Sequence, residues 1–324
     1  MDAVRLVRYV CLLIGLQGSI PFSLARRDWC DPGANIQGLD RNGVKSVTVS
    51  DSGTPENLLD TFLIRCKEHK QKCTDGRKKD CHKLWNLFYS SFAYKDPCIT
   101  NDLYSAFCDQ AAHNTERDKT LLYSGTYEQS RDLGYTTLED TLTGYMLDGI
   151  KQWCGQKTSP GINYKSCKAR GECKDPPSNA QCAFWQQASI KFAQMAKGKV
   201  SILLDGSEND GAVISDSYLV QYEIPNLQKE TVSEVEIFMI YTGTSKMEEC
   251  GDGSVENLEN IIRERGIKVT CKDFKMGVKT AKSQVSEIRA SDEDCDPTST
   301  GVSVGVNIGN TAFCLLLYII QKRQ

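Results

Sequence analysis

Histidine is scarce in this sequence of 324 residues, which contains only His69, His82 and His113. Each of them lies in a charged or cysteine-bounded segment, as is typical of a surface histidine. A serine or cysteine hydrolase needs a base beside its nucleophile, and that base is usually histidine. A disulfide-rich hydrolase of this kind is therefore the least favoured of the enzyme classes considered.

Net charge is also nearly absent, because 39 basic and 42 acidic residues leave a formal charge of −3. Such a chain has no field that would gather phosphate backbones, so nucleic acid is not expected as a partner. No P-loop occurs. The run from Gly251 to Gly253 begins like a dinucleotide fingerprint, but Glu256 stands where the third glycine belongs, which excludes a Rossmann site.

Cysteine, in contrast, is abundant, with 15 residues. No Cys-x-x-Cys pair occurs and no histidine stands at ligand spacing from a cysteine pair, which argues against zinc and for disulfides in an oxidising compartment. Setting aside Cys11 and Cys314 near the two ends leaves an odd number. At least one cysteine is therefore expected to be free or intermolecular. No N-glycosylation sequon is present.

The two ends suggest targeting. Residues 1–25 combine a basic start, an apolar run and a small-residue ending, which predicts a cleaved secretory signal. An uncleaved anchor is the alternative, but the apolar run is shorter than the ~20 residues of a span. Small residues precede an apolar tail in residues 299–324, which favours a glycolipid anchor; the basic end favours a single span, and a soluble luminal protein is the third option. All three place the globular part outside the cytosol.

The body of the chain divides by periodicity. Residues 26–198 form a mainly helical lobe, with apolar residues spaced by three and four at Leu58, Leu59, Phe62, Leu63, Cys66, Leu84, Leu87, Phe88, Phe184, Ile190, Phe192 and Met195. Residues 199–298 predict strands at 200–204, 219–224, 235–241 and 267–271, with a helix from Asp252 or Ser254 to Arg265. The strand–helix–strand order implies parallel pairing. We expect an α/β (α+β) fold with a small, mostly parallel sheet, disulfide-bonded, and a ligand between the lobes.

Acidic and aromatic residues are the remaining candidates for a site. Glu139 and Asp140 could merely complement a helix N-terminus. Glu139 and Asp148 are nine residues apart and would lie on opposite faces of a straight helix, so only a break near Gly144 or a deep pocket would let both contact one ligand. Glu223 ends an apolar predicted strand, where an acid facing a cleft is a catalytic candidate. Trp185 shares a helical face with the residue four positions later, a pattern that is more often core than site.

Several ordered segments resemble the ADP-ribosyl cyclase family, which comprises molluscan cyclases and mammalian cell-surface NAD glycohydrolases. They are residues 121–125, 137–145, 153–155, 162–167, 184–185, 205–207 and 222–227, and they span roughly residues 66–271. The resemblance implies a helical lobe and a parallel-sheet lobe that flank a cleft. It also implies cleavage of the nicotinamide–ribose bond of NAD or NADP, with transfer of ADP-ribose to its own adenine, to water, or to another pyridine base such as nicotinic acid.

This chemistry fits a chain poor in histidine. Nicotinamide leaves as a neutral molecule, so no general acid is needed, whereas the cationic ribosyl centre needs a carboxylate beside it. NAD and NADP are substrates, so no resident cofactor or metal is expected. The alternative is a catalytically weak cell-surface receptor or adhesion protein on the same scaffold. The partners implied are the nucleotide, the membrane through the tail and, as an open option, a second copy in a dimer.

The resemblance also implies residue roles. It makes Glu223 the catalytic residue and stacks Trp185 on the substrate. It places Glu139 and Asp148 near the nicotinamide amide, and it makes Ser124 and Ser189 phosphate-side donors. The rest of the substrate-binding wall is formed by Tyr123, Gly125, Tyr218 and Leu219. The chain departs from the family where Tyr123 replaces a tryptophan, and where Tyr218 and Leu219 replace two phenylalanines of the molluscan form. Gly125 agrees with the molluscan form and not with the mammalian arginine, and one inserted residue precedes Trp153.

The same resemblance implies a disulfide pattern. It pairs Cys66 with Cys81, Cys98 with Cys173, Cys154 with Cys167 and Cys250 with Cys271. Cys108 and Cys182 lie outside those pairs, and we expect them to pair with each other only for that reason. The expected location is the cell surface or the lumen of a vesicle.

Overall fold

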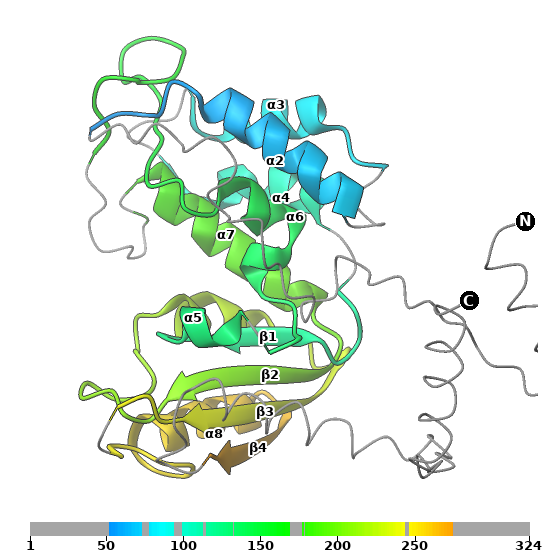
Figure 1. Cartoon of the computed structure of the whole chain (residues 1–324), viewed down its shortest axis with the longest axis vertical. Coiled ribbons are helices and arrows are strands. Elements are labelled where there is room, and N and C mark those ends of the chain that lie inside the picture. The colour runs from blue at the N-terminus through cyan, green and yellow to red at the C-terminus, as the bar shows by residue number, and fades with distance from the viewer. Residues whose placement is uncertain are drawn as a thin grey trace, which may run out of the picture.

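A computed structural model describes residues 52–274, except 73–77, 94–98, 113–114, 132, 169–176, 178 and 244–245. Four parallel strands form one sheet in the order β1-β2-β3-β4 (Figure 1). They are β1 (Thr120–Tyr123), β2 (Gly198–Asp205), β3 (Val232–Ile240) and β4 (Lys268–Asp273). The predicted mixed fold with a small parallel sheet is confirmed. The predicted signal at 1–25 and tail at 299–324 lie outside the described residues.

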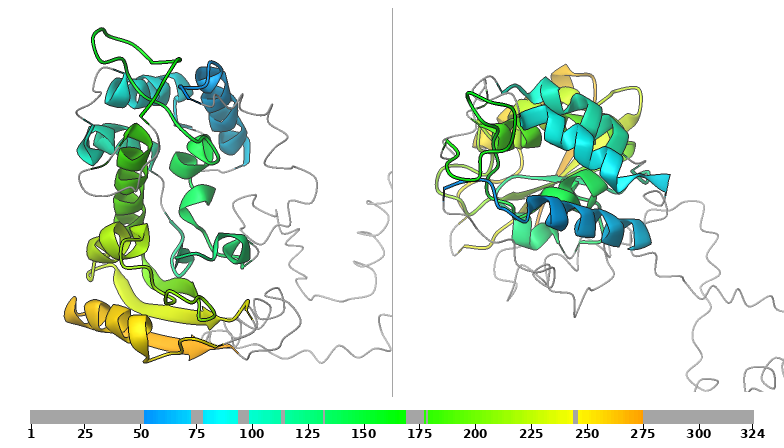
Figure 2. Two further views of the ribbon diagram at one scale, coloured as in Figure 1. Left: turned by 90° about the vertical axis from the view of Figure 1, so that its left-hand side faces the viewer. Right: turned by 90° about the horizontal axis from the view of Figure 1, so that it is seen from above.

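Helices occupy most of the remaining described chain. They are α2 (Leu58–Lys72), α3 (Cys81–Phe92), η2 (Asn101–Tyr104), α4 (Ser105–Ala111), α5 (Tyr127–Ser130), η3 (Leu138–Asp140), α6 (Leu142–Leu147), α7 (Ala180–Met195), η4 (Leu219–Glu223), η5 (Ile224–Asn226) and α8 (Gly253–Glu264). Figures 1 and 2 show α2, α3, α4 and α6 gathered away from the sheet, with α7 running from them toward it. None of these helices combines the length and the hydropathy that a membrane crossing requires.

The helical part is built around aromatic side chains. Phe88 lies at the centre, with ring centroids 5.1–6.2 Å from those of its neighbours Phe62, Trp85, Phe92, Tyr104, Phe107, Trp153 and Phe184. The indole of Trp153 donates a hydrogen bond of 2.9 Å to the Tyr104 hydroxyl, so this buried pair satisfies its polar atoms internally. The cluster fixes α7, because Phe184 belongs to that helix.

Both faces of the sheet are buried at its central strands, as is usual for parallel sheets, whereas β4 is partly exposed. Val235, Ile237 and Met239 of β3 join the main core, whereas Phe238 and Ile240 face a second cluster on the other side. Near-continuous apolar runs made β2 and β3 recognisable in the sequence, and β4 was recognisable from its place after the helix α8. The exception is β1, which has four residues, lies within the predicted helical lobe and pairs with β2 from Thr120 to Tyr123.

The predicted strand at residues 219–224 is wrong. Leu219–Glu223 forms a π-helix, and Ile224–Asn226 continues as a 3₁₀ turn with Pro225 at its start, where proline is well tolerated. The first and last residues of the π-helix are buried four positions apart, while Gln221 between them is exposed. A run this short has no periodicity that separates a strand from a helical turn. Single-turn π-helices are frequent at functional sites.

Three of the predicted disulfides are confirmed among the described residues. They join Cys66 to Cys81, Cys154 to Cys167 and Cys250 to Cys271, with Cα atoms 5.9, 5.6 and 5.6 Å apart.

The predicted pairing of Cys108 with Cys182 is wrong. Cys108 is a free thiol that packs in the helical core, and Cys182 is disulfide-bonded, but not to Cys108. The two cysteines were expected to pair only because neither had another assigned partner. That reasoning failed because an odd number of cysteines leaves one thiol free, and a buried cysteine packs like a small apolar residue. The predicted bond between Cys98 and Cys173 lies outside the described residues.

Candidate functional site

Glu139 and Asp148 are separated by a break in the helical backbone. The turn η3 is closed by Asp140, whose Oδ2 accepts hydrogen bonds from the Thr137 nitrogen at 2.9 Å and from the Thr137 hydroxyl at 2.8 Å. Thr141 is then extended, with φ −71° and ψ 157°, and caps the first turn of α6 through its hydroxyl. The break thus lies at Thr141, three residues before the position expected, and Asp140 has the local capping role.

Gly144 has a different role from the one expected. A Cβ at this position would lie 2.2 Å from the carbonyl oxygen of Leu138 and 2.8 Å from Cα of Glu139. Glycine therefore lets α6 fold back against η3. The close approach fixes the backbone that carries Glu139.

Tyr123 holds the Glu139 carboxyl. Its hydroxyl, at the carboxyl end of β1, donates a hydrogen bond of 2.6 Å to Oε1 of Glu139, and Oε2 of Glu139 is buried with no hydrogen-bond partner. Burial raises the pKa of Glu139, and the Tyr123 hydrogen bond opposes part of that rise. Burial and the Glu139 charge also raise the pKa of Tyr123. An unsatisfied buried oxygen needs a donor from a ligand.

Asp148 lies beside the same group. Its charge raises the pKa of Glu139, its Oδ2 accepts from the Tyr127 hydroxyl at 3.4 Å, and its carbonyl accepts from Arg65 at 2.5 Å. Tyr127 lies in α5 and its ring is 6.0 Å from that of Tyr123. Tyr127 and Arg65 could not be singled out from the sequence, because neither belongs to a motif or to a distinctive pattern.

Glu223 is the most buried of the three acids, with 7% of its surface exposed. The hydroxyl of Ser189, on α7, donates a hydrogen bond of 2.9 Å to Oε1 of Glu223. Burial raises the pKa of Glu223 to about 8; the Ser189 hydrogen bond lowers it and the charge of Glu139 raises it further. A strongly perturbed carboxyl with a specific partner is a candidate for function. Ser189 was expected to be a phosphate-side donor, but the structure shows it bonded to Glu223.

The elements bring four of the predicted residues together. β1 contacts η4, and α7 contacts both η3 and η4. As a result Tyr123, Glu139, Ser189 and Glu223 form one electrostatically linked group, which we call the carboxyl pair with its two hydroxyls. It lies where β1 ends, and ligands of parallel sheets bind at the carboxyl ends of the strands.

The other predicted residues surround this group less directly. Trp185 is half-buried one turn before Ser189, and its ring lies 4.9 Å from Phe184. The Tyr218 ring lies 5.7 Å from Tyr222, and Leu219 is buried in the core.

Ser124 and Gly125 follow β1 directly. Ser124 is buried, and its nitrogen donates to the carbonyl of Leu203. Gly125 is exposed with φ +74°, a backbone angle that favours glycine. The described part of the chain contains no cluster of three or more potential metal ligands.

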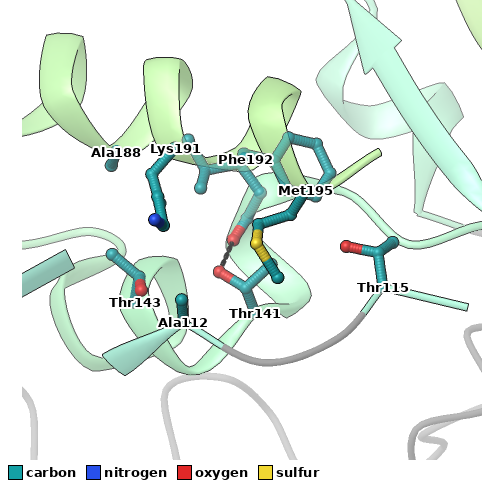
Figure 3. Close-up of a pocket in the computed structure, with 9 residues that line it drawn as sticks. Ala112, Thr115, Thr141, Thr143, Ala188, Lys191, Phe192 and Met195 are labelled. Carbon is teal, nitrogen blue, oxygen red and sulfur yellow. Dashed lines mark hydrogen bonds between the residues drawn. The ribbon is translucent and has the colours of Figure 1, made fainter. Parts of the chain in front are cut away.

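A separate pocket opens on another side of α7 (Figure 3). Leu138 and Thr141 line it from one side, and Ala188, Phe192 and Met195 of α7 line it from the other. Its empty volume is about 280 Å³, including space that is open to solvent. None of the predicted site residues lines this pocket, so the pocket is separate from the carboxyl pair.

Comparison with known proteins gives one consistent result. The sequence model described as ADP-ribosyl cyclase matches residues 55–288. The ADP-ribosyl cyclase/cyclic ADP-ribose hydrolase of Aplysia kurodai is 35% identical over 230 residues, covering 67% of this chain and 79% of the relative. Its human relative, ADP-ribosyl cyclase/cyclic ADP-ribose hydrolase 2, is 33% identical over 227 residues, covering 68% and 70%.

Solved structures agree with these relatives. Aplysia cyclase, crystallised with the substrate NGD and the product cGDPR, superposes with a TM-score of 0.63 at 31% identity, covering 76% of this chain and 97% of the other. Porcine CD38 in complex with a covalent intermediate superposes with a TM-score of 0.62 at 30% identity, covering 69% and 98%.

Proposed function

Because the chain belongs to the ADP-ribosyl cyclase family, we propose that it cleaves the bond between nicotinamide and ribose in NAD or NADP, with Glu223 as the catalytic carboxylate. The observation that carries this proposal is the buried Glu223 carboxyl, which accepts a hydrogen bond from Ser189. A carboxylate removed from water interacts strongly with a positive charge beside it.

The reaction needs little from the protein besides that charge. When the glycosidic bond breaks, its electron pair moves to the pyridine nitrogen, which neutralises the pyridinium, and the anomeric carbon becomes cationic. The Glu223 carboxylate stabilises that carbon until an acceptor attacks it. Porcine CD38 has been crystallised with a covalent intermediate, ribo-F-ribose-5'-phosphate, which supports a ribosyl–enzyme stage in this proposal.

The raised pKa of Glu223 is compatible with this role. In the free protein at neutral pH the carboxyl is largely neutral, because its pKa is about 8. A bound pyridinium cation favours the charged form and lowers the pKa of a neighbouring carboxyl. Substrate binding thus favours the ionised form of the Glu223 carboxyl, which the reaction requires. We expect kcat/KM, which reports the free enzyme, to fall below about pH 8, and kcat to persist to lower pH.

The remaining residues form the substrate-binding wall in this proposal. Glu139 and Asp148 accept from the carboxamide of nicotinamide, consistent with the unpartnered Oε2 of Glu139. Trp185 stacks on the substrate, and Ser124 donates to phosphate. Ser189 donates its hydrogen bond to Glu223.

Tyr218, Leu219 and Gly125 complete the wall that folds the nucleotide. Aplysia cyclase with its bound substrate and cyclic product supports nucleotide binding at this fold.

Three outcomes follow from three acceptors. The adenine of the same molecule gives cyclic ADP-ribose, water gives ADP-ribose, and nicotinic acid gives base exchange, which converts NADP to NAADP. The three described disulfides support folding in the secretory pathway. We propose presentation at the cell surface or in a vesicle lumen, with the C-terminal tail as the attachment to the membrane.

The decisive experiment measures nicotinamide release from NAD by the full chain purified from a secretory expression system. We expect turnover by the wild type and a loss of at least about 100-fold in Glu223→Gln, the scale of one electrostatic stabiliser. Glu264→Gln, an exposed acid at the end of α8, is the matched control and should keep full activity. A wild type that binds NAD without releasing nicotinamide would instead support the receptor on the same scaffold, and an active Glu223→Gln would move the role to Glu139.

A further inference from the structure

Each member of the carboxyl pair accepts a hydrogen bond from one side-chain hydroxyl. Tyr123 of β1 donates to Glu139 at 2.6 Å, and Ser189 of α7 donates to Glu223 at 2.9 Å. The acids themselves lie in two different turns, η3 and η4. Four separate segments therefore meet in one small network, with a donor on each side.

The segments that carry the two carboxyls pack around the same helix, because α7 contacts both η3 and η4, and the charge of Glu139 acts on Glu223. Both are buried enough that desolvation is the largest influence on their pKa values and raises them, and the charge of Glu139 raises that of Glu223 further. Two like charges in a shared buried site are unfavourable, so such a pair loses its protons in two coupled steps. Over the pH range between those steps, the pair carries a single negative charge.

We propose that the two hydroxyls decide which carboxyl carries that charge: Ser189 favours charge on Glu223, and Tyr123 favours charge on Glu139. A hydrogen bond donated to a carboxylate stabilises the ionised form of that carboxylate at the expense of its neighbour. This inference rests on the proposed function, because only charge on Glu223 drives the reaction. Tyr123 is then a positioning residue that withholds charge from the catalytic acid, and substrate must overcome it.

The surrounding groups favour Glu223 as the site of the charge. Asp140 and Asp148 lie near Glu139, and their charges disfavour a negative charge on Glu139. The other titratable or charged groups near Glu139 or its turn are Tyr127 of α5 and Arg65 and His69 of α2. Arg65 donates to two backbone carbonyls, those of Met146 and Asp148. For Glu223, the one neighbouring charge that raises its pKa is that of Glu139. The hydrogen bond from Tyr123 thus favours the ionised form of Glu139, whereas the charges of Asp140 and Asp148 disfavour it.

The test is the pH profile of kcat for nicotinamide release in two hydroxyl deletions. Tyr123→Phe should move the acidic limb to lower pH by about half a unit, because Glu139 becomes neutral more readily and its charge no longer opposes Glu223. Ser189→Ala should move the limb to higher pH by about one unit, the scale of one charge-assisted hydrogen bond. A purely structural role would lower kcat at every pH and leave the limb in place.

Two controls sharpen the result. Tyr164→Phe removes a hydroxyl from a tyrosine that is 47% exposed and should change neither kcat nor the limb. When Glu139→Gln is already present, adding Tyr123→Phe should not move the acidic limb of kcat any further, because Tyr123 acts on that limb through the charge of Glu139. Shifts in the same direction in the two deletions, or an undiminished shift when Glu139→Gln is present, would overturn the inference.

A substrate-free measurement separates this inference from the proposed function. Carbon-13 labelling of glutamate carboxyls, with Glu139→Gln and Glu223→Gln to assign the signals, reports both titrations by NMR. We expect Tyr123→Phe to raise the apparent pKa of Glu139 and lower that of Glu223. If these titrations move as expected while Glu223→Gln remains active, the charge assignment stands and the catalytic role fails; if Glu223→Gln is inactive and the titrations do not move, the reverse holds.

Discussion

Replacing Glu223 by glutamine should stabilise the protein while it abolishes turnover. The carboxyl has a pKa of about 8 in the folded protein, against an ordinary value of 4.5. Between these values the unfolded chain has lost this proton and the folded chain retains it, so the free energy of unfolding falls as pH rises. Below about pH 4.5 the group contributes no penalty, and above about pH 8 the penalty is complete.

The size of the effect follows from the width of that window. Each pH unit within it costs about 1.4 kcal/mol, so the penalty reaches about 3 kcal/mol at pH 7 and grows by roughly 2–3 kcal/mol between pH 5.5 and 7.5. Glutamine has no proton to lose but keeps an oxygen that accepts from Ser189. The variant should therefore lack this slope and exceed the wild type in stability most clearly at alkaline pH.

Urea unfolding at pH 5.5, 6.5, 7.5 and 8.5, with disulfides intact, measures the difference directly. The stability of Glu223→Gln relative to wild type should increase steadily across this series, whereas Glu264→Gln, the exposed control, should show a flat difference. If the difference in unfolding free energy between Glu223→Gln and wild type also stayed constant with pH, the wild-type Glu223 carboxyl would ionise normally. The argument that burial restrains this charge until substrate arrives would then be refuted.

Three further predictions concern other parts of the molecule. Non-reducing peptide mapping should return the three described bridges, and Cys108 should react with a thiol reagent only after unfolding; labelling of the native protein at Cys108 would contradict its burial. Tyr123→Trp should raise the share of cyclic product, because an indole offers more stacking area to the folded nucleotide, and unchanged chromatographic product ratios there and in Tyr218→Phe would contradict this. Gly144→Ala should lower the free energy of unfolding by roughly 1–3 kcal/mol, since its Cβ would meet the Leu138 carbonyl; a stability equal to that of the wild type, measured by urea unfolding, would show that α6 can shift.

The sequence allowed a good prediction of the sheet because the buried strands β2 and β3 are apolar runs, and β4 follows the recognisable helix α8. Strands β2, β3 and β4 and helix α8 were all expected close to their observed places. The exception, Thr120–Tyr123, is too short for its pairing with β2 to be read from local pattern. Pairing with a segment some 80 residues away is a tertiary effect that local propensity does not record.

The sequence pointed to candidate site residues but not to the contacts between them. Glu223 and Glu139 could be selected from sequence as candidate acids, but the hydroxyls that bond them depend on how β1 and α7 pack. The π-helix that carries Glu223 was mistaken for a strand, since five residues suit either pattern. The break at Thr141 was displaced by three residues because glycine is an ambiguous signal, used here for close packing instead of a bend.

The place of β1 in the sheet limits how the chain can be divided. Residues 199–274 would contain β2, β3 and β4 and look like a self-sufficient unit, but without Thr120–Tyr123 the edge of β2 would lose its partner. A bare, apolar strand edge is a template for pairing with other chains, so such a fragment should aggregate. The short strand from the helical half thus covers Val200–Leu203 of β2, which would otherwise form an exposed strand edge.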